Sequence, residues 1–289
     1  LIHDSNEVVE LDARSWPKSS SALLLGFTAD FLAPELGIML LEKRRENVFI
    51  LNKDEGLTMR LLFSMVASFR RYKPGDQIVL LTEESDPLLS SGSSFLSLLT
   101  SDYALDVRCG AESICDWLSG FDGEDAFVVI SNPEVLFERF EELGDASGMF
   151  GRKDTAIASI DDEIDRLLSI GSKTSGEAER GEEVVPATLF DARPRLFELM
   201  RGGGSKRVHA CVISDSRIDL FTLFGSVSHM EEFATLFPYK VLQSCSYSEA
   251  ISLGAIQASE ISAEDSKKKM LFVGKTGEVA LFEPYEIKL

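Results

Sequence analysis

The fold of this chain is decided by the stretch Val48-Phe49-Ile50-Leu51-Asn52-Lys53-Asp54-Glu55-Gly56-Leu57-Thr58, which continues to Phe69. It begins as an apolar, β-favouring run, passes a short polar turn, and then shows apolar residues at helical spacing. The apolar residues that would share one helical face are Leu57, Leu61, Leu62, Met65, Val66 and Phe69. The stretch therefore predicts a strand over 48–52, a turn, and a helix over 56–71.

Strand, turn and helix in this order form the layout of a phosphate-binding loop, whose amide groups hold an anion at a helix N-terminus. The working motif reads G-x-x-x-x-G-K-[ST], whereas residues 51–58 read L-N-K-D-E-G-L-T. The second glycine and the hydroxyl are present, but the first glycine and the lysine are missing. We therefore expect a degenerate nucleotide site at Asn52, Lys53, Asp54, Glu55, Gly56, Leu57 and Thr58.

Composition limits the remaining function classes. The 289 residues are 44% apolar and suffice for one large α/β domain or two small ones. No apolar run approaches the roughly 20 residues of a membrane span. The net charge of -19 would repel phosphate backbones, which argues against nucleic-acid binding. The four cysteines form no C-x-x-C pair and the three histidines are scattered, so no metal site is predicted.

The rest of the chain alternates strands with helices, which predicts an α/β fold with a mostly parallel, three-layer sheet. A β-rich lead-in over 1–45 should cover one edge of this sheet, and residues 270–282 should form a C-terminal hairpin. Residues 144–186 are rich in Gly, Ser and charged residues and predict a partly disordered insertion. We expect one domain over 1–289, and a start without Met indicates a piece of a longer protein. Further strands are predicted at 77–81, 104–107, 126–130, 208–213 and 239–242, and further helices at 94–100, 111–118, 133–137, 196–200 and 248–251.

Residues 48–69 and four other segments carry a resemblance to a known family. These segments are 25–28, 205–213 with His209, 246–254 and 272–285. In their order and spacing they resemble the FtsK/SpoIIIE family of P-loop ATPases, and within it the degenerate C-terminal modules of the type VII secretion motor (EssC/EccC). The resemblance implies a P-loop NTPase-like sheet of the RecA/FtsK type.

The departures from the family pattern concern the residues that handle ATP. In an active P-loop ATPase the loop lysine pairs with the β/γ-phosphates, and Leu57 stands at that position. The strand over 126–130 takes the place of the metal-holding strand, yet it ends in Ser131 and Asn132, which are neutral and cannot act as a base at neutral pH. A carboxylate about 4 Å from a phosphate would add about 4 kcal/mol of repulsion, as Asp54 or Glu55 could. We therefore expect no catalytic residue, no bound metal and no ATP–Mg cofactor.

The resemblance implies a catalytically inactive module on the cytoplasmic side of a bacterial cell membrane. Its partners would be neighbouring ATPase modules of the same chain and secreted protein substrates, within a hexamer in the full assembly, and not nucleic acid. Loss of the phosphate would leave an apolar groove flanked by Leu51 and Leu57, through which the module would bind.

Alternatives remain open. The chain could be an active or nucleotide-sensing ATPase that uses Lys53 or a partner's arginine, or a DNA translocase component, which the charge disfavours. Arg70 and Arg71 could serve as such an arginine in trans or simply be solvated, as could residues 43–45. His209 could be catalytic or a packing residue, and we favour packing.

Overall fold

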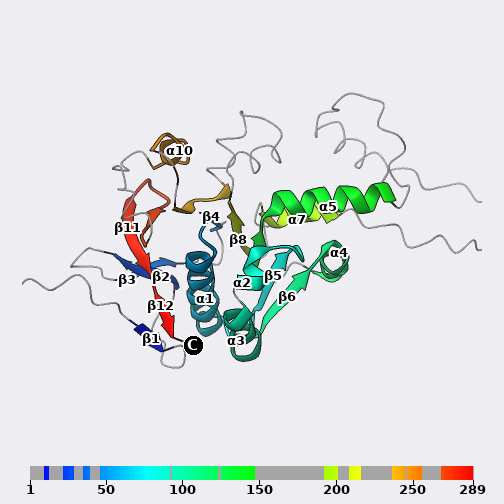
Figure 1. The fold of residues 1–289 in the computed structure, drawn as a ribbon, viewed down its shortest axis with the longest axis horizontal. Helices are drawn as coiled ribbons and strands as arrows, with labels where there is room; N and C mark the ends of the chain where they lie inside the picture. Colours follow the sequence, from blue (N-terminus) through cyan, green and yellow to red (C-terminus); the bar gives the residue numbers. More distant parts are fainter. Residues whose placement is uncertain are drawn as a thin grey trace, which may run out of the picture.

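The computed structural model describes residues 10–12, 22–28, 35–39, 46–91, 93–122, 125–146, 192–200, 208–215, 236–243, 245, 247–255 and 268–288 (Figure 1). Predicted features that fall on other residues, among them nearly all of the 144–186 insertion and the basic residues 43–45, lie outside this part.

Ten strands of the described part form one mixed sheet in the order β3-β2-β11-β10-β9-β4-β8-β7-β5-β6. The strands from β9 to β6 are parallel: β9 (Tyr239–Leu242), β4 (Val48–Leu51), β8 (Val208–Ser214), β7 (Ala126–Ser131), β5 (Gln77–Thr82) and β6 (Leu105–Cys109). The others join by antiparallel pairing: β3 (Glu35–Met39), β2 (Ala22–Thr28), β11 (Val279–Pro284) and β10 (Met270–Val273). A separate parallel pair joins β1 (Glu10–Asp12) to β12 (Glu286–Lys288).

Helices cover both faces of the parallel part (Figure 1). Apolar side chains of α1 (Glu55–Tyr72), α2 (Pro87–Ser91) and α3 (Ser93–Tyr103) share one core cluster with the sheet. Those of α4 (Ala111–Gly120), α5 (Pro133–Ala146), α7 (Ala192–Met200) and the short α10 (Tyr247–Ser252) share a second cluster on the opposite face. The predicted three-layer α/β fold with a mostly parallel sheet is thereby confirmed. None of the described helices has the length and apolar character needed to cross a membrane.

The sequence located most elements well and missed two. The hairpin of β10 and β11 is antiparallel as predicted, and β2 and β3 of the lead-in form one edge of the main sheet. Neither α2 nor β12 was predicted, because each is too short to show a periodic pattern. Helix α5 extends to Ala146, beyond the predicted start of the insertion.

Helix α1 is buried almost all round, because the lead-in strand β2 packs against it. Two helix serines bind the backbone of β2 directly. The N–H of Leu24 donates to Ser68 Oγ over 3.0 Å, and Ser64 Oγ donates to the carbonyl oxygen of Leu24 over 2.9 Å. They do so where the register between β2 and β3 shifts, between Leu24 and Gly26. The serines satisfy both polar backbone groups of one buried residue.

A Ser68→Ala variant should lower the free energy of unfolding by about 1–2 kcal/mol, because the buried N–H of Leu24 loses its acceptor. Urea unfolding followed by circular dichroism measures this. Ser97→Ala is the matched control, since Ser97 is an exposed helix serine whose Oγ donates only to the carbonyl of Ser93 in its own helix. Equal effects of the two substitutions would contradict the role of Ser68.

The close approach of β2 to β11 explains the glycine of the 25–28 segment. A Cβ atom on Gly26 would collide with the backbone carbonyl of Glu283 and with the ring of Phe282. Gly26 is opposite Pro284 in the ladder, so the absence of a side chain lets the lead-in join the sheet.

Candidate functional site

The degenerate loop lies at the carboxyl end of β4, where the direction of the strand connections reverses. After β4 the chain builds β5, β6, β7 and β8 on one side, and then crosses to β9 on the other side. In open α/β sheets, ligands bind in the crevice outside the carboxyl ends of strands at such a switch point. The fold therefore places residues 52–58 where a nucleotide site would be.

The loop itself is short and binds its own atoms. Only residues 52–54 lie between β4 and α1. Asn52 Nδ2 donates to the carbonyl oxygen of Asp54 over 2.8 Å and to Thr58 Oγ1 over 2.7 Å. The N–H of Asp54 donates in turn to Asn52 Oδ1 over 2.9 Å. One buried asparagine thus ties the turn to the first helical turn.

The carboxylate of Asp54 occupies the N-terminus of α1. Asp54 is the N-cap residue, and its Oδ1 accepts from the N–H of Leu57 over 2.9 Å. The carbonyl oxygen of Asp54 accepts from the N–H of Thr58 over 3.0 Å and from its hydroxyl over 2.9 Å. Free amides at a helix N-terminus are what a phosphate-binding loop offers to an anion. Here one of these amides, that of Leu57, already has an acceptor in the Asp54 side chain, whereas the N–H of Thr58 makes the ordinary first backbone bond of the helix.

The remaining loop residues divide into exposed and buried ones. Lys53, Asp54, Glu55 and Gly56 are exposed, whereas Asn52 and Thr58 are buried. Gly56 has no left-handed φ, so no special backbone conformation requires a glycine at this position. A Cβ atom there would lie 3.3 Å from Asp54 Oδ1.

The predicted apolar groove is wrong. Leu51 and Leu57 are only 5% and 7% exposed, and Leu51 belongs to the core cluster that contacts α4, α5 and α7. The side chains turn into the interior because β8 and β9 flank β4 within the sheet and helices cover the two faces of the sheet.

The end of β7 supplies the second half of the predicted site. Ser131 is fully buried, and its Oγ has no hydrogen-bond partner among the described residues. Asn132 adopts a left-handed φ of 45°, a conformation that asparagine tolerates better than most residues. Its N–H donates to the carbonyl oxygen of Ile213 in β8 over 2.8 Å. Both residues therefore lie at the carboxyl end of the sheet, as the loop does.

Asp86 is a buried carboxylate at the carboxyl end of the sheet, and the sequence did not predict its place there. Its Oδ2 accepts from Thr82 Oγ1 over 2.7 Å and from Asn132 Nδ2 over 3.4 Å. Its Oδ1 accepts from the N–H of Leu88 over 2.9 Å. The sequence signal was an aspartate followed by a proline, which is typical of a helix N-terminus, here that of α2. Asp86 links β5 to the end of β7.

Further hydrogen bonds join residues at and just beyond the strand ends, at the carboxyl end of the sheet. The N–H of Asn52 donates to the carbonyl oxygen of Ser214 over 3.1 Å, and the N–H of Gln243 donates to that of Leu51 over 2.8 Å. Ser214 Oγ donates to Glu134 Oε1 over 3.3 Å. Within the described ranges, no group of three or more His, Cys, Asp or Glu side chains could hold a metal ion. Apart from the exposed Lys53, the described residues named at this end of the sheet are neutral polar groups and carboxylates, a poor environment for a triphosphate.

His209 and Arg70 lie at the opposite end of the sheet. His209 is near the start of β8, whose other end, Ser214, is paired with Leu51 beside the loop. Burial lowers the pKa of its imidazole to about 4, and the positive charge of Lys73 adds to this effect. Arg70, at the end of α1, donates to the carbonyl oxygens of Tyr103, Pro74, Asp76 and Ala104. It joins turns and is partly exposed.

Searches of protein-family models and of curated proteins found no match. Among solved structures, the cytoplasmic domain of EssC aligns with a TM-score of 0.53 and 14% identity over 97% of this chain and 48% of that chain. Two structures of Thermomonospora curvata EccC each align with a TM-score of 0.49 and 13% identity over 95% of this chain. One contains ATPases 2 and 3 in complex with a signal sequence peptide, with 43% of it covered. The other is the cytoplasmic domain of this type VII secretion ATPase, with 28% covered.

This chain spans less than half the length of these neighbours. At this identity the likeness to EssC shows the fold alone. It confirms that the chain shares the α/β fold of the cytoplasmic domain of EssC, as the sequence resemblance implied.

Proposed function

We propose that this chain is a catalytically inactive FtsK/SpoIIIE-like module of a type VII secretion motor, which acts by binding. It would recognise an exported protein or regulate a neighbouring ATPase module of the same chain. The observation that carries the proposal is the Asp54 carboxylate on the N-terminus of α1, where it accepts from the N–H of Leu57. A negative charge of the chain itself takes the place where a phosphate would be bound.

Three further features support the proposal. No lysine follows Gly56, and Ser131 and Asn132 stand where a metal-holding carboxylate is expected. The net charge of -19 disfavours a nucleic-acid partner. The shared fold with the cytoplasmic domain of EssC supports a place on the cytoplasmic side of the membrane. The proposal further puts the module beside other ATPase modules in a hexameric assembly.

Calorimetric titration with ATP and Mg²⁺, together with a phosphate-release assay, tests the proposal. We expect no binding heat at millimolar nucleotide and no turnover, because the Asp54 carboxylate already caps the N–H of Leu57 and no lysine follows Gly56. Micromolar binding with turnover would refute it. If that binding were lost in a Lys53→Ala variant, the exposed loop lysine would be the missing cation, and the chain would be a nucleotide-sensing or active ATPase.

A further inference from the structure

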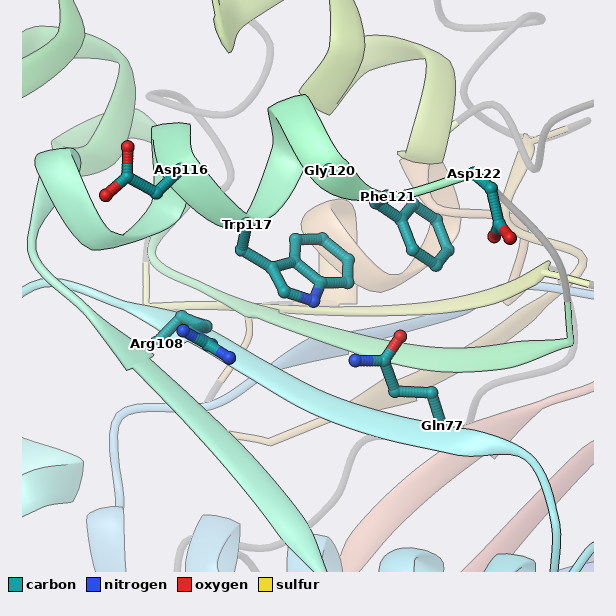
Figure 2. A pocket seen from close by; sticks show the side chains of 7 residues that line it. All are labelled: Gln77, Arg108, Asp116, Trp117, Gly120, Phe121 and Asp122. Atoms are coloured by element: carbon teal, nitrogen blue, oxygen red, sulfur yellow. The ribbon is translucent and has the colours of Figure 1, made fainter.

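A cavity of about 430 Å³ opens at the far side of the sheet from β4, between the last turn of α4 and the outer strands β5 and β6 (Figure 2). Its lining residues are Gln77, Arg108, Asp116, Trp117, Gly120, Phe121 and Asp122. None of them belongs to the degenerate nucleotide site. The cavity therefore needs an explanation of its own.

An aromatic pair with an unused donor forms the roof of the cavity. The rings of Trp117 and Phe121 stack with centroids 4.5 Å apart and an interplanar angle of 21°. Trp117 is only 8% exposed, and its Nε1 makes no hydrogen bond to any residue of the described part. Figure 2 shows this nitrogen directed into the space between Arg108 and Gln77. The indole N–H is not one of the buried donors that lack a partner, so it is open to the cavity, where a ligand can supply an acceptor for it.

Arg108 and Gln77 add donors on the opposite wall. Arg108 Nε and Nη2 both donate to Asp106 Oδ2, over 3.0 and 2.8 Å, which leaves Nη1 available. The side-chain amide of Gln77 lies opposite, turned toward the same space (Figure 2). The polar groups of the cavity thus match a planar group that accepts hydrogen bonds and can lie against an aromatic ring.

The charges around the cavity exclude an anionic group as the planar acceptor that it binds. Asp106 balances the one positive charge, that of Arg108, whereas Asp116 and Asp122 add two carboxylates. A phosphate or carboxylate would meet this excess of negative charge, on a chain whose net charge is -19. An uncharged amide is the acceptor that fits. Positively charged side chains on either side of this amide in the ligand would lie near the carboxylates of Asp116 and Asp122.

The cavity adjoins an open strand edge. In the described part, β6 is the last strand of the sheet and pairs only with β5. The N–H of Gly110 donates to the carbonyl oxygen of Thr82 in the β5 direction. Because alternate residues of a strand face alternate neighbours, the N–H and C=O groups of Val107 and Cys109 point away from β5. They are free to pair with one more strand.

We propose that this surface binds an extended, net-basic peptide segment of a partner protein. The segment adds a strand beside β6 and places an Asn or Gln side chain in the cavity, where its carbonyl accepts from Trp117 Nε1. Lysine or arginine residues flanking it lie near Asp116 and Asp122. This deepens the proposed function, on which it rests for its setting, by naming a partner class. The two fail separately, because nucleotide titration does not probe β6.

The test passes a pool of seven-residue peptides with blocked termini over the immobilised chain. Each peptide has valine at alternate positions and randomised residues between the valines. We expect the retained pool to be enriched in Lys or Arg near the ends and in Asn or Gln at the centre. Val107→Pro removes an outward N–H and keeps the ladder to β5, and it also replaces an apolar side chain that packs against the core shared with α1 and α3. Trp117→Phe keeps the aromatic ring and removes the donor. Each should lower retention about tenfold, the loss of one or two hydrogen bonds in a shielded site.

Asp116→Asn and Asp102→Asn form a matched pair, since Asp102 is an exposed carboxylate on α3, on the other face of the sheet. Only Asp116→Asn should weaken the enrichment of Lys and Arg in the retained peptides, with the carboxylate of Asp122 keeping part of it. If Val107→Pro fails to fold in a thermal melt, Trp117→Phe decides alone. Unchanged retention by Trp117→Phe, selection of acidic peptides, or no selection at all would overturn the proposal.

Discussion

A Leu57→Lys variant, which restores the lysine of a phosphate-binding loop, should be about 3 kcal/mol less stable than the wild type and should still not bind ATP. Leu57 is 7% exposed, so the substitution removes a buried apolar side chain and places an ammonium group in its position. Nucleotide binding should not follow, because the N–H of residue 57 would still donate to Asp54 Oδ1. A lysine alone does not create a site whose amides are occupied.

Urea unfolding and calorimetric titration with ATP and Mg²⁺ measure the two parts of this expectation. Leu57→Met is the matched control, since it keeps an apolar side chain of similar volume and should cost less than about 1.5 kcal/mol. A variant carrying both Asp54→Gly and Leu57→Lys removes the capping carboxylate as well. Millimolar or tighter ATP binding by Leu57→Lys alone would show that the loop retains a usable phosphate site.

The strand and helix around this loop were predictable because their signals are local. The predicted strand over 48–52 and helix over 56–71 agree within one residue with β4 and α1. The capping role of Asp54 was also visible as an aspartate three residues before the N–H it caps. The phosphate-loop motif pointed instead to the missing lysine. The structure shows that the Asp54 carboxylate caps the helix N-terminus where a phosphate would bind.

The remaining errors arise from contacts between segments far apart in the chain. Leu51 and Leu57 looked available for a groove, yet both are buried, and Leu51 packs in a core cluster with residues of α4, α5 and α7 that come 60 or more positions later. Asp86 joins the end of β7 through Asn132, which is 46 positions away. The cavity beside Trp117 depends on how α4 packs over Gln77 and Arg108. Local patterns predict elements, and they do not predict which side chains tertiary packing buries or exposes.

The stability of the fold should fall by about 3 kcal/mol between pH 6.5 and pH 4 through His209 alone. Burial, with a smaller contribution from Lys73, lowers the pKa of this imidazole from 6.5 to about 4 in the folded state. In the unfolded chain the imidazole takes up a proton near pH 6.5. The stabilisation of the neutral form is therefore complete above pH 6.5 and is lost as the pH falls through this window, at about 1.4 kcal/mol for each pH unit.

Urea unfolding of the wild type and a His209→Gln variant at several pH values between 4 and 7 separates this contribution from those of the carboxylates. The variant removes the titrating group from a side chain that is 7% exposed, and its stability should change less with pH by about 3 kcal/mol across the range. A Lys73→Met variant should show a smaller pH dependence than the wild type, because removing the nearby positive charge raises the pKa of His209. Parallel curves for the wild type and His209→Gln would mean that the imidazole is protonated in the folded protein. His209 would then have an acceptor for its proton, and it could not be the buried, neutral packing residue that its position in β8 implies.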